Sequence, residues 1–69
     1  MNMSFVNARK RTGMSQMEVA RRLNINQSSV ARWETGKSIP RAFMLVKLAD
    51  LYCCTIDELM GREQGRDSA

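Results

Sequence analysis

The chain has 69 residues, 43% of them hydrophobic, and its eleven lysines and arginines outnumber seven acidic residues, for a net charge of +4. A chain this short builds one core without room for a separate catalytic cleft, and it contains no histidine, so neither an enzyme nor a usual zinc site is expected. The basic balance favours a polyanionic partner, with nucleic acid ahead of an anionic membrane.

Two short helices are predicted at the start of the chain. The first covers residues 4–12 and ends at Gly13, which readily adopts the left-handed conformation of a helix end. The second begins at Ser15, where the sequence SQME has the serine and the glutamate of a capping box, and it runs to about Leu23. Asn24 tolerates the left-handed conformation better than most residues, so a turn is predicted there.

A third helix is predicted from Asn26, its N-cap, to Thr35, with Gly36 ending it. Because each residue of a helix is turned by about 100° from the one before, this helix divides into two faces. Val30 and Trp33 fall on the inner face. The outer face carries amide, hydroxyl, methyl and guanidinium groups, from Gln27, Ser28, Ala31 and Arg32. Such groups are suited to reading hydrogen-bond patterns on another molecule.

Two further helices are predicted after Pro40, which suits the first turn of a helix. The fourth covers residues 41–52, and the fifth, opened by the capping-box sequence TIDE, covers residues 55–60 before Gly61. The apolar stripe of the fourth helix consists of Ala42, Leu45, Leu48, Ala49 and Tyr52. Residues 62–69 are polar and have no apolar anchor, so we expect one domain over residues 4–61 followed by a mobile polar tail.

The cysteines and the N-terminal residues indicate in which cellular compartment the protein is expected. Cys53 and Cys54 are neighbours, and adjacent Cα atoms lie ~3.8 Å apart, below the ~4.4 Å lower limit of usual disulfides. We interpret them as small apolar fillers in a reducing compartment. The start, MNMSFVNARKR, lacks a secretory signal, and no apolar run approaches the ~20 residues of a membrane span. We expect a soluble, cytoplasmic protein without a metal or another cofactor.

The second and third helices together predict a DNA-binding unit. A turn of about three residues joins them and the small residue Ala20 lies where they cross, which describes a helix-turn-helix over about residues 16–35. The second helix of such a unit lies in the major groove, where Gln pairs with adenine, Arg with guanine, Ser with either, and an Ala methyl contacts thymine. We therefore predict that the outer face of the third helix contacts bases. The competing interpretation is an ordinary amphipathic helix with a polar face, the commonest element of small helical proteins.

Most of the chain resembles a known family. The segments GMSQMEVARRLNINQSSVARWETGKSIP, LVKLADLY and TIDELMG, within residues 5–61, resemble the Cro/CI-type helix-turn-helix family of transcriptional regulators, also called the XRE family. The resemblance implies an all-α, five-helix, lambda-repressor-like domain that binds operator DNA as a dimer. It also implies that Gln27, Ser28 and Arg32 are base-contacting residues.

Further roles follow from the resemblance, residue by residue. Gln16 matches a position that contacts phosphate and braces the reading helix. Asn26 and Lys37 match phosphate-facing positions. Arg9 and Glu34 match an arginine–glutamate ion pair that ties the first helix to the end of the third.

The chain also departs from the family pattern. Asn24 and Cys53 stand where the family often has glycine. Phe43, Met44 and Leu51 fall at positions of the fourth helix that are usually polar in the family. These three residues either enlarge the core or form an exposed apolar patch for a partner subunit.

A dimer interface is expected opposite the DNA-reading edge, at the end of the fourth helix and on the fifth. Its apolar candidates are Leu51, Cys53, Ile56 and Met60, with Met44 one helical repeat before the first of them. The leading function is a sequence-specific DNA-binding regulator, most simply a repressor on a palindromic operator, with no small-molecule ligand and no membrane partner. The alternative is a protein-interaction module, such as an antitoxin or antirepressor-like domain, which the unusual apolar residues of the fourth helix favour.

Overall fold

The computed structural model describes residues 4–61, and this part of the chain contains five α-helices and no strand. The helices are α1 Phe5–Thr12, α2 Gln16–Leu23, α3 Gln27–Thr35, α4 Ala42–Tyr52 and α5 Ile56–Leu59. The all-α prediction is confirmed for these residues, and each helix begins one residue after its predicted range because that range includes the N-cap. The tail predicted at residues 62–69 lies outside the described residues. None of the described helices has the length and apolar character of a membrane span.

The helix starts follow the predicted N-caps, with two corrections. The capping box at Thr55 is complete, but the one at Ser15 is only half formed. Ser15 Oγ accepts from the backbone N–H of Glu18 at 3.0 Å, while the Glu18 carboxylate accepts from Arg22 at 3.2 Å instead of from the Ser15 backbone. Asn26 occupies the N-cap position of α3 but makes no side-chain cap hydrogen bond. A charge-assisted partner at i+4 has therefore replaced the second bond of the box at α2.

The end of α4 keeps a left-handed residue although that residue is a cysteine. Asn24 and Cys53 have φ values of 59° and 57°, so both adopt the conformation that glycine adopts most readily. For a residue with a Cβ this conformation costs roughly 1–2 kcal/mol. Arg11 supports the α4 end, because its guanidinium donates to the carbonyl oxygens of Tyr52 at 3.1 Å and Cys53 at 3.0 Å. The last turn of α1 is thereby tied to the last turn of α4.

The start of α4 differs from the prediction at Pro40. Arg41 is the N-cap, in an extended conformation with φ −70° and ψ 163°, so the proline precedes the helix instead of lying in its first turn. Pro40 is buried, which means that its ring packs the incoming loop against the domain. The proline therefore positions the loop between α3 and α4.

The core draws on every helix. Its buried residues are all apolar or aromatic: Ala8, Val19, Ala20, Val30, Leu48, Ala49, Tyr52 and Leu59. In the predicted stripe of α4, Leu48, Ala49 and Tyr52 are buried, Leu45 is half-buried and Ala42 is exposed. Ala42 is the first residue of α4, so the prediction failed where the helix extends beyond the core.

The apolar residues of α4 that depart from the family pattern were predicted either to enlarge the core or to form an exposed patch, and the structure shows both. Met44 and Leu51 pack against the core and enlarge it. Phe43 is 59% exposed, and its ring centre lies 5.8 Å from the Lys47 ammonium nitrogen. The other large hydrophobic residue of α4 that is exposed is Val46. Exposed apolar surface therefore exists on α4, but two of the three predicted residues contribute mainly to the core.

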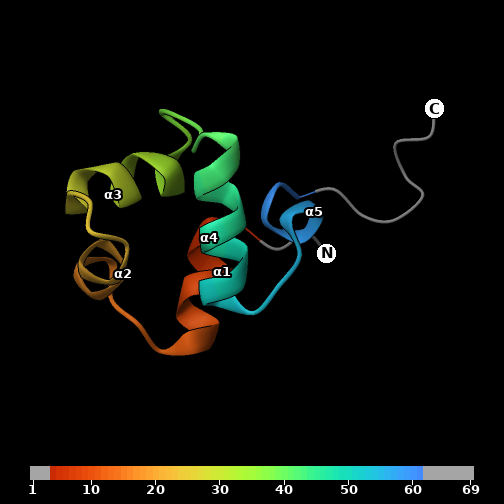
Figure 1. The fold of residues 1–69 in the computed structure, drawn as a ribbon, viewed down its shortest axis with the longest axis horizontal. Helices are drawn as coiled ribbons and strands as arrows, with labels where there is room; N and C mark the ends of the chain where they lie inside the picture. The colour runs from red at the N-terminus through yellow and green to blue at the C-terminus, as the bar shows by residue number, and fades with distance from the viewer. Residues whose placement is uncertain (1–3, 62–69) are drawn as a thin grey trace.

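The helices are arranged so that the two predicted interfaces lie apart. Figure 1 shows α2 and α3 at one end of the domain, α1 and α4 in the middle, and α5 at the opposite end. Contacts between α2 and α3, between α1 and α4, and between α4 and α5 hold this order, and α1 also contacts α3. The helix pair predicted to bind DNA is thus separated from the helix predicted to form a dimer.

Candidate nucleic-acid interface

The α2–α3 unit is held by a short turn and a small residue at the crossing. Asn24, with φ 59° and ψ 46°, ends α2, and the backbone N–H of Ile25 donates to the carbonyl oxygen of Ala20 at 2.9 Å. Ile25 then packs against the core. Ala20 is only 3% exposed, so a larger side chain there would separate the helices or strain the core. The geometry of a helix-turn-helix is therefore present over the predicted residues.

The outward side of α3 carries most of the residues predicted to contact bases. Val30 is 1% exposed, and Trp33 packs against the same core, so the inner face is as predicted. On the other side Gln27, Ser28 and Arg32 are exposed, as is Thr35 in the last turn, while Ala31 is partly buried. The structure thus brings the four predicted side chains to one side of one helix.

Two of the three residues predicted to contact phosphate flank α3. Asn26 is exposed at the start of the helix, and its amide is not used as a cap. At the other end Gly36 turns the chain with φ 81°, and the backbone N–H of Lys37 donates to the carbonyl oxygen of Arg32 at 2.9 Å. That bond holds the exposed Lys37 beside the last turn of α3. Within residues 4–61 the ion pairs join Arg9 to Glu34 and Arg22 to Glu18, so neither Lys37 nor Arg32 is neutralised by them.

A largely buried ion pair anchors the end of α3 to α1. Arg9 donates from Nε to Glu34 Oε2 at 2.6 Å and from Nη2 to Glu34 Oε1 at 3.1 Å. The side chains are 13% and 4% exposed. A third bond runs from Arg9 Nη1 to the carbonyl oxygen of Met14 at 3.0 Å, which ties in the loop before α2. The hydrogen bond to Glu34 is the main reason why the pKa of Arg9 lies above its ordinary value.

Gln16 extends this anchor to the exposed side of α3. Its Nε2 donates to Glu34 Oε1 at 2.8 Å, and its Oε1 accepts from Gln27 Nε2 at 3.2 Å. The resemblance predicted a bracing role for Gln16 without naming its partners. Those partners are 18 and 11 residues away in the sequence, so no local pattern could have indicated them. One continuous series of hydrogen bonds therefore runs from Arg9 to the first residue of α3.

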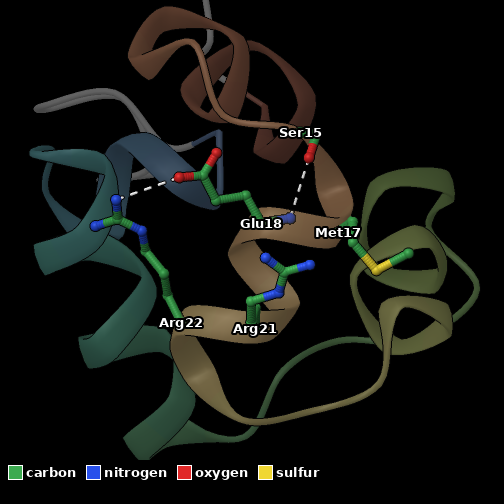
Figure 2. Close-up of a pocket in the computed structure, with 5 residues that line it drawn as sticks. All are labelled: Ser15, Met17, Glu18, Arg21 and Arg22. Carbon is green, nitrogen blue, oxygen red and sulfur yellow. Dashed lines mark hydrogen bonds and ion pairs between the residues drawn. The ribbon is translucent and has the colours of Figure 1, made fainter.

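The outward face of α2 contributes the cation of Arg21, which the sequence analysis did not single out. A hollow of about 360 Å³ is lined by Ser15, Met17, Glu18, Arg21 and Arg22, whose side chains are drawn in Figure 2. Arg22 is turned toward Glu18, with which it pairs. Arg21 also lines a second hollow, together with Asn26 and Gln27. Arg21 and Arg22 are adjacent in the last turn of α2. The sequence alone does not show that Arg22 pairs with Glu18 while Arg21 lies beside Asn26 and Gln27.

Comparison with known proteins gives a family match and several similar regulators. The helix-turn-helix family matches residues 7–59. The transcriptional repressor RstR of the cryptic phage CTXphi, from Vibrio cholerae, is 38% identical over 56 residues, which are 81% of this chain and 50% of that protein. The transcriptional regulator AnsR of Bacillus subtilis is 39% identical over 61 residues, 88% of this chain and 53% of that protein. The transcriptional activator BcrR of Enterococcus faecalis is 32% identical over 56 residues, 78% of this chain and 28% of that protein.

The similarity to these regulators covers only part of each of them. The chain spans about half the length, or less, of these relatives. No solved structure matches the chain significantly. The similar proteins are regulators, in agreement with the expectation that the chain is not an enzyme, and they include both a repressor and an activator.

Proposed function

The chain belongs to the Cro/CI-type helix-turn-helix family, with its lambda-repressor-like fold, and from this premise we propose that it is a DNA-binding transcriptional regulator. The observation that carries the proposal is the outward side of α3, where Gln27, Ser28 and Arg32 are exposed beside the unpaired cation of Lys37 within the described residues. A helix with these groups, supported from behind by a second helix, suits insertion into the major groove.

The residues divide into two roles. Gln27, Ser28, Ala31 and Arg32 contact base edges, because amide, hydroxyl, methyl and guanidinium groups match the donors, acceptors and thymine methyl of the major groove. Gln16, Asn26 and Lys37 contact phosphates on either side, which fixes the register of α3 on the duplex. The positive end of the α3 dipole adds to the attraction near Asn26.

The salt dependence of binding to duplex DNA tests the proposal. The logarithm of the binding constant should fall linearly with the logarithm of the salt concentration, with a slope of about −0.9 for each phosphate neutralised. Lys37→Ala should weaken binding to all sequences alike and reduce the slope by about one. Lys47→Ala, the matched control on α4, should leave the slope unchanged. Absence of any selective, salt-dependent binding by the wild type would refute the proposed function.

The regulator acts most simply as a repressor bound as a homodimer to a palindromic operator. One module buries only ~600–1,000 Å² on DNA, so two copies on half-sites ~34–36 Å apart would double the contacts. The proposed interface lies at the end away from α2 and α3 (Figure 1). There Ile56 is 36% exposed, Met60 is 39% exposed and Cys53 is exposed, while Leu51 is partly buried.

The dimer proposal is tested most cleanly at Ile56. Leu51 is also a predicted interface residue, but it packs against the core, so Leu51→Glu would change folding as well as assembly. Ile56→Glu places a charge on the exposed side of α5 and should abolish cooperative binding to two half-sites while leaving binding to one half-site intact. Val46→Glu, at a residue 49% exposed outside the proposed interface, is the control. Sedimentation and gel-shift data with one domain per site, unchanged by Ile56→Glu, would contradict the dimer.

A second function is a protein-interaction module such as an antitoxin or antirepressor-like domain. The observation that favours it is the exposure of Phe43 at 59% and Val46 at 49% on α4, together with Ile39 at 66% just before it. A stable complex with the product of a neighbouring gene, combined with no affinity for duplex DNA, would support this function over the first.

A further inference from the structure

We propose that Arg21, in the last turn of α2, binds a phosphate of the DNA backbone together with the side-chain amide of Asn26. The inference rests on the proposed function and deepens it, because it adds a second cation, beside Lys37, to the groups that anchor α3 on the duplex. None of the roles implied by the family resemblance falls on Arg21.

Arg21 carries a charge that the described part of the chain does not neutralise. Its neighbour Arg22 donates to the Glu18 carboxylate at 3.2 Å, and Figure 2 shows the Arg21 guanidinium apart from that pair. Successive residues of a helix are turned by about 100°, so two adjacent arginines face different surroundings. Neither ion pair within residues 4–61 includes Arg21, and its side chain is exposed. The guanidinium is therefore available to an anion.

Arg21 lies beside the start of α3. It lines a hollow of about 360 Å³ at the turn between α2 and α3, and the other polar side chains around this hollow are Asn24, Asn26 and Gln27. Of the described residues that line the hollow, none carries a carboxylate. One cation is thus combined with amide N–H donors, and both kinds of group donate to phosphate oxygens in protein–DNA complexes.

The Asn26 amide is free to take part in this site. An asparagine at an N-cap usually accepts a hydrogen bond from the backbone N–H of the second or third helical residue. Asn26 occupies the N-cap of α3 without making this bond, and its side chain is exposed. Its NH₂ group can therefore donate to the same phosphate as Arg21.

The position of Arg21 on α2 indicates a phosphate and not a base as its target. In a helix-turn-helix unit the second helix lies in the major groove, whereas the first crosses the DNA backbone. Arg21 belongs to α2, the first helix of the unit, and lies beside Gln27, which is proposed to contact a base. A phosphate held between Arg21 and Asn26 fixes α2 and α3 at one point of the backbone, and so sets the register at which Gln27 meets the bases.

A pair of matched variants tests the cation. Arg21→Gln and Arg22→Gln each remove one positive charge from adjacent positions of α2, and the amide introduced by the second keeps a donor for Glu18. Binding is measured over a range of salt concentrations, on the duplex that the wild type selects from a randomised pool. Arg21→Gln should weaken binding about tenfold and make the salt slope shallower by about 0.9. Arg22→Gln should leave both the affinity and the slope near their wild-type values.

A scan with methylphosphonate linkages identifies the phosphate. Each such linkage replaces one charged phosphate oxygen of the same duplex by a methyl group. One linkage should weaken wild-type binding about tenfold and have little effect on Arg21→Gln, because the partner cation is already absent there. The same linkage should have a smaller effect on Asn26→Ala than on the wild type, since both side chains donate to that phosphate.

The outcomes separate this inference from the proposed function. If Arg21→Gln and Arg22→Gln have equal affinities and slopes, Arg21 holds no phosphate of its own and the inference is wrong, while DNA binding stands. If Arg21→Gln changes the base preference at one position of a randomised selection, Arg21 reads a base and the phosphate assignment is overturned. If Arg21→Gln and Asn26→Ala suppress the effects of different linkages, the shared site is wrong. If the wild type binds no duplex selectively, the proposed function and the inference fail together.

Discussion

Replacing Glu34 by alanine should destabilise the domain more than removing any exposed charge would. The Glu34 carboxylate accepts three hydrogen bonds, two from Arg9 and one from Gln16, and its side chain is 4% exposed. Glu34→Ala leaves the guanidinium of Arg9, itself only 13% exposed, without its counter-charge. Removing one partner of a buried pair costs ~3–5 kcal/mol, mostly because the other charge stays buried and unpaired.

This cost is large for a chain of 69 residues. At ~0.05–0.15 kcal/mol per residue, the free energy of unfolding of the whole chain is ~3–10 kcal/mol. For a small domain 1 kcal/mol corresponds to about 4–8 °C in melting temperature, so Glu34→Ala should lower the Tm by at least about 12 °C. In the lower part of the stability range the variant would be largely unfolded at room temperature.

Thermal melts followed by circular dichroism measure this difference, and α2 supplies a matched control. Glu18 pairs with Arg22 at 3.2 Å, but their side chains are 45% and 56% exposed. Glu18→Ala should therefore cost less than about 1 kcal/mol. In a double-mutant cycle, Arg9→Ala added to Glu34→Ala should cost much less than Arg9→Ala alone. Equal melting temperatures for Glu34→Ala and Glu18→Ala would refute the anchoring role of the buried pair.

Three further predictions concern the core and the helix starts. Burial raises the pKa of Tyr52 from 10.0 to about 12, so the folded state retains a proton that the unfolded chain releases. The free energy of unfolding should therefore fall as the pH rises from about 10 to 12. In urea unfolding, Tyr52→Phe should lack that part of the decline. Ala20→Leu should cost ~1–3 kcal/mol in the same assay, because the α2–α3 crossing is already closed, and a neutral result would contradict the tight crossing. Thr55→Ala should lose ~0.5–2 kcal/mol with its capping box, while Asn26→Ala, whose side chain makes no cap bond, should melt as the wild type does; the reverse order would be inconsistent with the observed caps.

The helices and the faces of α3 could be predicted because their signals are local. Gly13, Asn24 and Gly36 each end a helix in the left-handed conformation, as their positions in the sequence indicated. Val30 and Trp33 pack inward as the helical period required. These features depend on a residue's own conformational preferences and on neighbours within a few positions.

The features that sequence reasoning missed arise where several partners compete or where distant residues meet. Spacing alone predicted that the Glu18 carboxylate would accept a hydrogen bond from the Ser15 backbone. Arg22 instead offers a charge-assisted bond to the same carboxylate. Asn26 occupies a cap position without using its side chain. The series of bonds through Gln16 joins three helices, and its existence depends on how α1, α2 and α3 pack. Such contacts follow from tertiary structure, which short-range patterns do not encode.

The central claim is that α3 reads bases with its outward side, and a selection from randomised duplexes comparing the wild type with Arg32→Ala tests it most directly. Arg32 is exposed on that side of α3. Arg32→Ala should lose the preference at one base position, equivalent to ~1–3 kcal/mol, and keep the preferences at the others. Identical base preferences for the two proteins would contradict base reading by this side of α3.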